Sequence, residues 1–177
     1  YYAAVQNGVV NLATVLPLGI YGEKTFGISV TDKNETYNVT INALVVTMTI
    51  TTSDQYANWI TIAKACEQSA TLWGGYFRLG ANITATSMVM FNRGATDGSE
   101  GFKGVFDGCG YIIDGLNRSS WDSNAFVTTM TETGVLKNIA FTNVRITGEG
   151  NFLTSGGKGT IENVYVQYKG ISAGSQY

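Results

Sequence analysis

Residues 134–139 read Gly-Val-Leu-Lys-Asn-Ile, and residues 159–164, which begin 25 positions later, read Gly-Thr-Ile-Glu-Asn-Val. The correspondence continues at the same offset, where Phe141 falls on Val166. A fixed period of this size is typical of stacked architectures, in which each coil buries its inward side chains against the coils above and below it. Apolar residues within each copy occupy alternate positions, which is the pattern of a strand. The repeat therefore predicts a stack of coils built from short strands separated by bends.

An earlier copy of the unit is expected at Ile113-Asp114-Gly115-Leu116, about 23 residues upstream of Leu136. Leucine-rich repeats have a similar period but need a denser ladder of leucines than this chain contains. A parallel β-helix fits the pattern better. We therefore interpret residues 76–177 as the coils of a parallel β-helix.

Residues 102–116 read Phe-Lys-Gly-Val-Phe-Asp-Gly-Cys-Gly-Tyr-Ile-Ile-Asp-Gly-Leu. This segment resembles the F-x-G-x-F-D-G-x-G-x-x-I-x-G-L signature of bacterial surface proteins with pectin-lyase-like β-helices, including those with GLUG repeats. The resemblance spans roughly residues 52 to 172, and departs from the pattern at Cys109, usually a small polar residue, and at Tyr111, where histidine is common. It implies a right-handed parallel β-helix and an extracellular, cell-surface setting. It implies no single activity, because one fold serves many functions.

Residues 1–50 alternate apolar and polar positions in short runs. Two such runs, residues 26–30 and 37–41, flank the turn sequence Asp-Lys-Asn-Glu at residues 32–35 and predict a β-hairpin. Residues 27–46 resemble the C-terminal strands of bacterial Ig-like repeats. At most four strands fit here, whereas a complete Ig sandwich has about seven. We expect the C-terminal part of an Ig-like domain in a fragment of a longer chain.

Residues 52–69 change to a helical period, with Trp59, Ile62, Ala63 and Cys66 on one face. Thr52 followed by Gln55 is compatible with a capping box. We assign residues 51–75 to a linker and an α-helix that caps the first coil. The expected fold is thus all-β: partial Ig-like sandwich strands, a capping α-helix and a right-handed parallel β-helix.

Composition excludes several classes of function. The net charge is -2 and charged residues make up only 14% of the chain, which argues against nucleic-acid binding and against anionic membranes. No apolar run reaches the roughly 20 residues of a membrane span. The chain has no histidine, so the usual general base and most zinc sites are missing. For Cys66 and Cys109 we favour two buried thiols over a disulfide.

Carboxylates are the first candidates for chemistry, because a glycosidase needs two of them roughly 5 to 9.5 Å apart. Asp107 and Asp114 lie within the signature segment, and each precedes a glycine. A short acceptor before glycine also fits turn chemistry, in which it bonds nearby backbone, and we favour that role. Both residues are kept as candidates for ligand binding, and no catalytic residue is assigned.

Three further features are candidate sites. Asp97 and Glu100 could supply oxygen ligands to Ca²⁺, although their spacing matches no established calcium loop, and we expect no cofactor. Asn138 and Asn163 align between coils and predict an asparagine ladder at a bend. Trp121 lies in a polar stretch and could stack on a sugar ring, whereas Trp59 is expected in the core.

We expect a non-catalytic adhesin or stalk segment at the cell surface, whose β-helix contacts a polysaccharide or a host surface protein. Two alternatives stay open. One is a polysaccharide lyase or hydrolase of the pectin-lyase-like class, with its acids in missing coils. The other is a phage receptor-binding or decoration protein.

Overall fold

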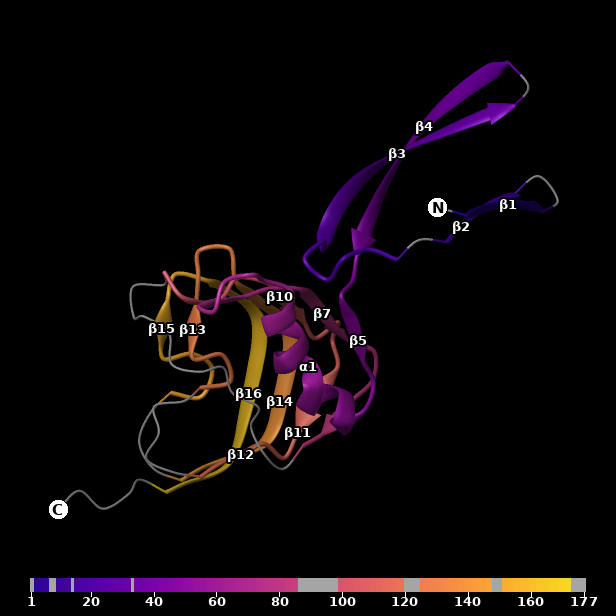
Figure 1. Cartoon of the computed structure of the whole chain (residues 1–177). Coiled ribbons are helices and arrows are strands. Elements are labelled where there is room, and N and C mark those ends of the chain that lie inside the picture. Colours follow the sequence, from indigo (N-terminus) through magenta and orange to yellow (C-terminus); the bar gives the residue numbers. More distant parts are fainter. Residues whose placement is uncertain are drawn as a thin grey trace.

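The computed structural model describes residues 2–6, 9–13, 15–32, 34–85, 99–119, 125–147 and 151–172. In this part of the chain the protein is mostly β, with one helix and two parallel sheets (Figure 1). The elements are β1 (Tyr2–Gln6), β2 (Val9–Ala13), β3 (Gly22–Asp32), β4 (Glu35–Val45), β5 (Met48–Ile50), α1 (Ser53–Ala65), β6 (Leu72–Trp73), β7 (Tyr76–Leu79), β8 (Ile83–Thr84), β9 (Gly101–Phe102), β10 (Val105–Asp107), β11 (Ile112–Asp114), β12 (Asn117–Ser119), β13 (Thr129–Met130), β14 (Val135–Thr147), β15 (Gly156–Gly157) and β16 (Thr160–Ser172).

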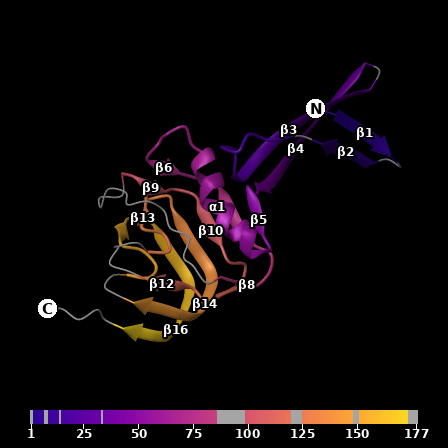
Figure 2. The ribbon, with the colours of Figure 1, turned by 60° about the horizontal axis from the view of Figure 1, so that its bottom comes forward.

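Along the sequence, the chain adds strands alternately to the two parallel sheets. One sheet has the order β6-β9-β13-β15, and the larger one joins β5, β7, β10, β14 and β16 side by side, with β8, β11 and β12 also in it. After each strand of the small sheet the chain adds its next strand to the large one. Successive stretches of sequence therefore lie on top of one another (Figure 2).

The 25-residue repeat is confirmed by the register of β14 and β16. Leu136 pairs with Ile161 and Phe141 pairs with Val166, as the alignment of the two copies predicts. Two positive-φ asparagines, Asn138 (φ 53°) and Asn143 (φ 52°), bend β14 into three short segments. Asparagine tolerates this left-handed conformation better than most residues, which suits it to a bend between strands.

The earlier copy of the repeat was placed wrongly. Leu136 pairs with Phe106 rather than with Ile113, and Ile113 pairs with Phe141. The offset is therefore not fixed, because the turn between β10 and β11 contains two more residues than the bend at the matching place in β14. The alternation of apolar and polar residues alone does not reveal such a difference in turn length, since β10 and β11 each offer a large apolar residue, Phe106 and Ile113, at an inward position.

An aromatic cluster fills the space between the two sheets. Trp59, which has no exposed surface, lies with its ring centroid 4.8 Å from that of Phe106 and 5.6 Å from that of Phe77. Phe102 of the small sheet and Phe126 each lie 5.9 Å from it. The expected core position of Trp59 is confirmed, and helix α1 thereby anchors both sheets.

Helix α1 is shorter than the predicted span of residues 52–69. The Thr52 side chain accepts a hydrogen bond from the backbone N–H of Gln55, as a capping box requires. The return bond differs from the prediction, because Gln55 Oε1 accepts from the backbone N–H of Thr51 at 2.7 Å instead of from Thr52. The helix packs on β5, β6 and β8, the first strands of their columns, and so covers that end of the stack.

The N-terminal strands form two antiparallel hairpins, β1–β2 and β3–β4, and β3–β4 projects away from the stack (Figure 1). The predicted hairpin is confirmed, with Phe26 opposite Ile41 and Ile28 opposite Val39. Strand β5 lies inside the range expected to be Ig-like, yet it pairs with β7 in the large parallel sheet. The parallel sheet thus begins at Met48.

Candidate functional site

A row of charged side chains crosses the large sheet on the face opposite the core. Arg78, Asp107, Lys137 and Glu162 occupy matching positions on β7, β10, β14 and β16, so that their charges alternate in sign. The preceding residue on each of the first three strands, such as Phe106, is fully buried. Because side chains alternate across a strand, this order places the row on the outer face.

Asp107 lies between Arg78 and Lys137 in this row and is only 8% exposed. Its Oδ1 accepts hydrogen bonds from the backbone N–H of Cys109 at 2.9 Å and from Nδ2 of Asn138 at 3.2 Å. Its Oδ2 accepts from the Tyr76 hydroxyl at 3.0 Å and lies 3.5 Å from Lys137 Nζ. We call these five residues the Asp107 cluster. The bond to Cys109 is the local turn contact expected for an aspartate before glycine.

The cluster keeps Asp107 ionised. Burial alone would raise its pKa, but the hydrogen bonds from Cys109, Asn138 and Tyr76, together with the charge of Lys137, outweigh burial and hold the pKa below its usual value. A carboxyl that acts as a general acid near neutral pH needs a raised pKa. The arrangement is therefore suited to a structural carboxylate rather than to proton donation.

The pKa values of two further groups in the cluster, the Tyr76 hydroxyl and the Cys109 thiol, are raised, which favours their neutral forms. Burial, followed by the hydrogen bond to Asp107 and its negative charge, raises the pKa of Tyr76 to about 12. Partial desolvation of the thiol, followed by the charge of Asp107, also raises the pKa of Cys109, although the residue as a whole is exposed. A raised pKa leaves little thiolate at neutral pH, so Cys109 is not an activated nucleophile.

Both cysteines are free thiols. Cys66 is buried, as expected, whereas the expectation was wrong for Cys109, which is exposed. Cys109 lies in the turn after β10 with a φ of 51°, and this turn carries it onto the surface.

Asp114 lies on the next strand segment, β11, and belongs to a separate set of contacts. Its Oδ1 accepts hydrogen bonds from the Thr142 hydroxyl and from Nδ2 of Asn143, each at 2.6 Å. Both bonds lower the pKa of Asp114, and the bond from Thr142 has the larger effect. The partners lie on the neighbouring strand β14 instead of in a local turn. Asp107 and Asp114 share no hydrogen-bond partner among the contacts described here.

The aligned asparagines extend the Asp107 cluster towards the last strand. Asn163 Nδ2 donates to Asn138 Oδ1 at 3.1 Å, and Asn138 in turn donates to Asp107. Both asparagines have positive φ, so the line of amides follows the bends of successive coils. This is the geometry expected from the alignment of the two repeats.

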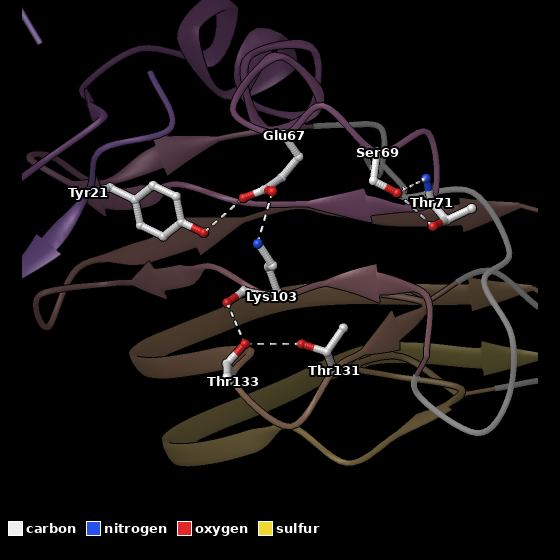
Figure 3. Close-up of polar contacts among 7 residues, drawn as sticks. All are labelled: Tyr21, Glu67, Ser69, Thr71, Lys103, Thr131 and Thr133. Carbon is white, nitrogen blue, oxygen red and sulfur yellow. Dashed lines mark hydrogen bonds and ion pairs between the residues drawn. The ribbon is translucent and has the colours of Figure 1, made fainter. Parts of the chain in front are cut away.

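A second polar region lies at the turns of the small sheet (Figure 3). Glu67 Oε2 lies 2.9 Å from Lys103 Nζ, and its Oε1 accepts a hydrogen bond from the Tyr21 hydroxyl at 3.2 Å. Thr133 donates to the Lys103 carbonyl at 3.1 Å and lies 3.2 Å from the Thr131 hydroxyl. The Glu67 contacts tie the segment before β3 to the stack.

Beside these residues is a shallow hollow with a volume of about 440 Å³. It brings together hydroxyls and charges that can bond a polyhydroxylated ligand. The polar lining consists of Ser99, Lys103, Thr131, Glu132, Thr133 and Lys158. The pair Lys158–Glu132 at its rim is highly exposed, so it contributes little to stability.

Of the three remaining candidate residues from the sequence, the structure describes only Glu100. Trp121 and Asp97 lie outside the described residues. Glu100 follows Ser99 in the bend before β9, and within the described ranges no group of metal-binding side chains is found. No helix in the described part is long and apolar enough to cross a membrane.

Sequence reasoning missed Tyr76 and Lys137 as partners of Asp107. The signal that could have found them is the row spacing: Arg78, Asp107 and Lys137 recur 29 and 30 positions apart, each after a large apolar residue. The hollow could not be found in this way, because its residues come from turns of different length.

No known protein family and no solved structure matches the chain. A curated protein that it resembles is halomucin of Haloquadratum walsbyi, with 32% identity over 115 residues. The match covers 57% of this chain and about 1% of the length of halomucin.

Proposed function

We propose that this chain is a non-catalytic segment of a cell-surface protein, an adhesin or stalk that presents a side face to a glycan or a host protein. The single observation that carries the proposal is the bonding of Asp107. Its two oxygens accept three hydrogen bonds and face one ammonium group, which is what a carboxylate does when it fixes neighbouring strands.

We further propose that the stack is a right-handed parallel β-helix. Three features support it: two parallel sheets filled in turn, left-handed asparagines at the bends, and a helix over one end. A stack of this kind is stiff, because the backbone hydrogen bonds of each coil are made with the coils beside it. Stiffness suits a segment that holds a binding face at a distance.

The β3–β4 hairpin is proposed as part of an Ig-like module. Its apolar side chains share one face, where Phe26, Ile28 and Val30 lie opposite Ile41, Val39 and Tyr37. The other face is polar, with hydrogen bonds such as that from Thr25 to Asn42. One apolar face and one polar face are typical of a sheet in a sandwich.

The extracellular, cell-surface location is part of the same proposal. The similarity to halomucin supports it. The ligand surface is proposed at the hollow beside Lys103 and at Trp121. The hollow offers hydroxyls and cations, and the indole offers an apolar face for a sugar ring.

The test is binding and turnover measured together. The purified chain is applied to a glycan array, and in parallel to acidic and neutral polysaccharides whose products are analysed. We expect binding without cleavage, weakened by Trp121→Ala or by Lys158→Gln. Tyr37→Ala, on the distant hairpin, is the matched control and should bind like the parent chain.

Two results would favour the alternatives. Cleavage that is abolished by Asp107→Ala or Asp114→Ala would show a polysaccharide-active enzyme and overturn the proposal. A stable trimer, with no glycan bound, would favour a phage structural protein.

A further inference from the structure

Both strands of the β3–β4 hairpin are held to the stack at the base of the hairpin. At the end of β4, only Val46 separates the hairpin from Thr47, whose backbone N–H donates to the Tyr76 carbonyl at 2.8 Å. At the start of β3, the Tyr21 hydroxyl donates to Glu67 Oε1 at 3.2 Å (Figure 3). A hairpin fixed through one strand can rotate about the soft backbone dihedrals of the connecting residue. Attachment of both strands removes this freedom.

The Tyr21 hydroxyl occupies a space that exists because residue 74 is glycine. A Cβ atom at Gly74 would clash with the Tyr21 hydroxyl and with Glu67 Oε1. In later coils the strand register gives the equivalent position a side chain, and the residues there are Lys103, Thr131 and Lys158. The first coil therefore leaves room, at this position, for a side chain from the base of the hairpin.

The acceptor of the Tyr21 hydrogen bond is itself held in place. Glu67 Oε2 lies 2.9 Å from Lys103 Nζ, so one carboxylate links Tyr21 to the second coil. Burial, followed by the negative charge of Glu67, raises the pKa of Tyr21 to about 12, so the hydroxyl stays protonated and remains a donor at neutral pH. The chain at Gly19 also passes close to the end of α1, because a Cβ there would lie 3.0 Å from the Cys66 carbonyl oxygen. The segment before β3 is therefore packed against the stack.

We propose that Tyr21, seated in the socket formed by Gly74 and Glu67, is a latch that fixes the direction of the β3–β4 hairpin relative to the stack. With the latch closed, the hairpin and the stack move as one body. With the latch open, the hairpin pivots at Val46. A stiff joint suits a stalk that holds a binding face at a distance, and this benefit rests on the proposed function, whereas the latch rests only on the contacts at the base of the hairpin.

The test opens the latch from either side and measures the order of the hairpin by NMR. Tyr21→Ala removes the side chain that enters the socket. Gly74→Ala fills the socket, at a residue without a positive φ, so alanine adds no backbone strain. In the parent chain, order parameters derived from residual dipolar couplings should be about 0.85 for the amides of both β4 and β14. In each variant those of β4 should fall below about 0.6, while those of β14 stay unchanged and show that the stack is folded.

The double variant Y21A/G74A establishes whether the two changes act through one contact. Because each change alone breaks that contact, the hairpin of the double variant should be no more mobile than that of the single variants. Gly27→Ala, on β3 where a Cβ meets open space, is the matched control and should leave the hairpin as ordered as in the parent chain.

A hairpin that is already mobile in the parent chain, or that stays ordered in Tyr21→Ala, would overturn the proposal. So would a double variant clearly more mobile than either single one, because the two residues would then act independently. The experiment contains no glycan, so its failure is distinct from a failure of the chain to bind on the array.

Discussion

The β3–β4 hairpin and the parallel stack are built from similar alternating sequences, yet they bury very different amounts of apolar surface. Val39 on the hairpin is 51% exposed, whereas Val144 in the stack has no exposed surface. The hairpin pairs residues that are close in sequence, while the stack pairs residues a full coil apart. The difference shows that alternation determines which side chains share a face, but a second layer determines whether that face is buried.

Removing the tryptophan at the centre of the stack should have the largest effect. Trp59→Ala would leave a cavity among four phenylalanine rings and lower the free energy of unfolding of the stack by about 3–5 kcal/mol. Urea denaturation followed by far-UV circular dichroism measures it. Ile62→Ala, at a partly buried position of the same helix, is the control and should cost clearly less. Equal effects would mean that Trp59 is not the anchor.

Valine-to-alanine substitutions can be made at a buried position of the stack and at a half-exposed position of the hairpin. Val144→Ala removes a fully buried side chain and should lower the free energy of unfolding by about 2–3 kcal/mol. Val39→Ala, at a half-exposed hairpin position, should change it by about 0.5 kcal/mol or less. Urea midpoints of the two variants give the result. A larger loss for Val39→Ala would show that another surface covers the hairpin in solution.

Asp107→Asn should cost about 2 kcal/mol at neutral pH, because it removes the charge that Lys137, Tyr76 and Asn138 face. The folded pKa of Asp107 lies below its ordinary value of 3.8. The carboxylate therefore stabilises the fold above that value, and this contribution is lost as the pH falls through the folded pKa. The difference between the parent chain and the variant, measured by urea denaturation, should shrink below about pH 4. A difference independent of pH would contradict the role given to the charge.

Asn138→Ala should have the smallest effect within the stack, about 1–2 kcal/mol, because alanine is strained at a φ of 53°. Asn138→Gly relieves the strain but still lacks the amide that bonds Asp107 and Asn163. Thermal unfolding of the pair separates the two contributions. If both variants are equally unstable, the loss comes from the amide line and not from the bend.

Much of the stack could be predicted from the sequence. The repeat of residues 134–139 at 159–164 gives the register of the last two long strands, and the helical period around Trp59 gives α1. The register of the earlier strands could not be predicted, because the turn at residues 108–111 adds residues that parity does not reveal.

The candidate site was predicted only in part. An aspartate before glycine indicates a local turn, and the Cys109 N–H does bond Asp107. Its other partners, Tyr76, Lys137 and Asn138, come from neighbouring coils about 30 residues away in each direction. Such contacts depend on register, so no local pattern could identify them.

The most direct test of the central proposal, that Asp107 has a structural and not a catalytic role, combines two readouts on Asp107→Asn. Unfolding by urea and release of oligosaccharides from acidic and neutral polysaccharides are measured for the parent chain and the variant. We expect a lower free energy of unfolding for the variant and no released oligosaccharide from either protein. Release by the parent chain that disappears in a variant of unchanged stability would contradict the account.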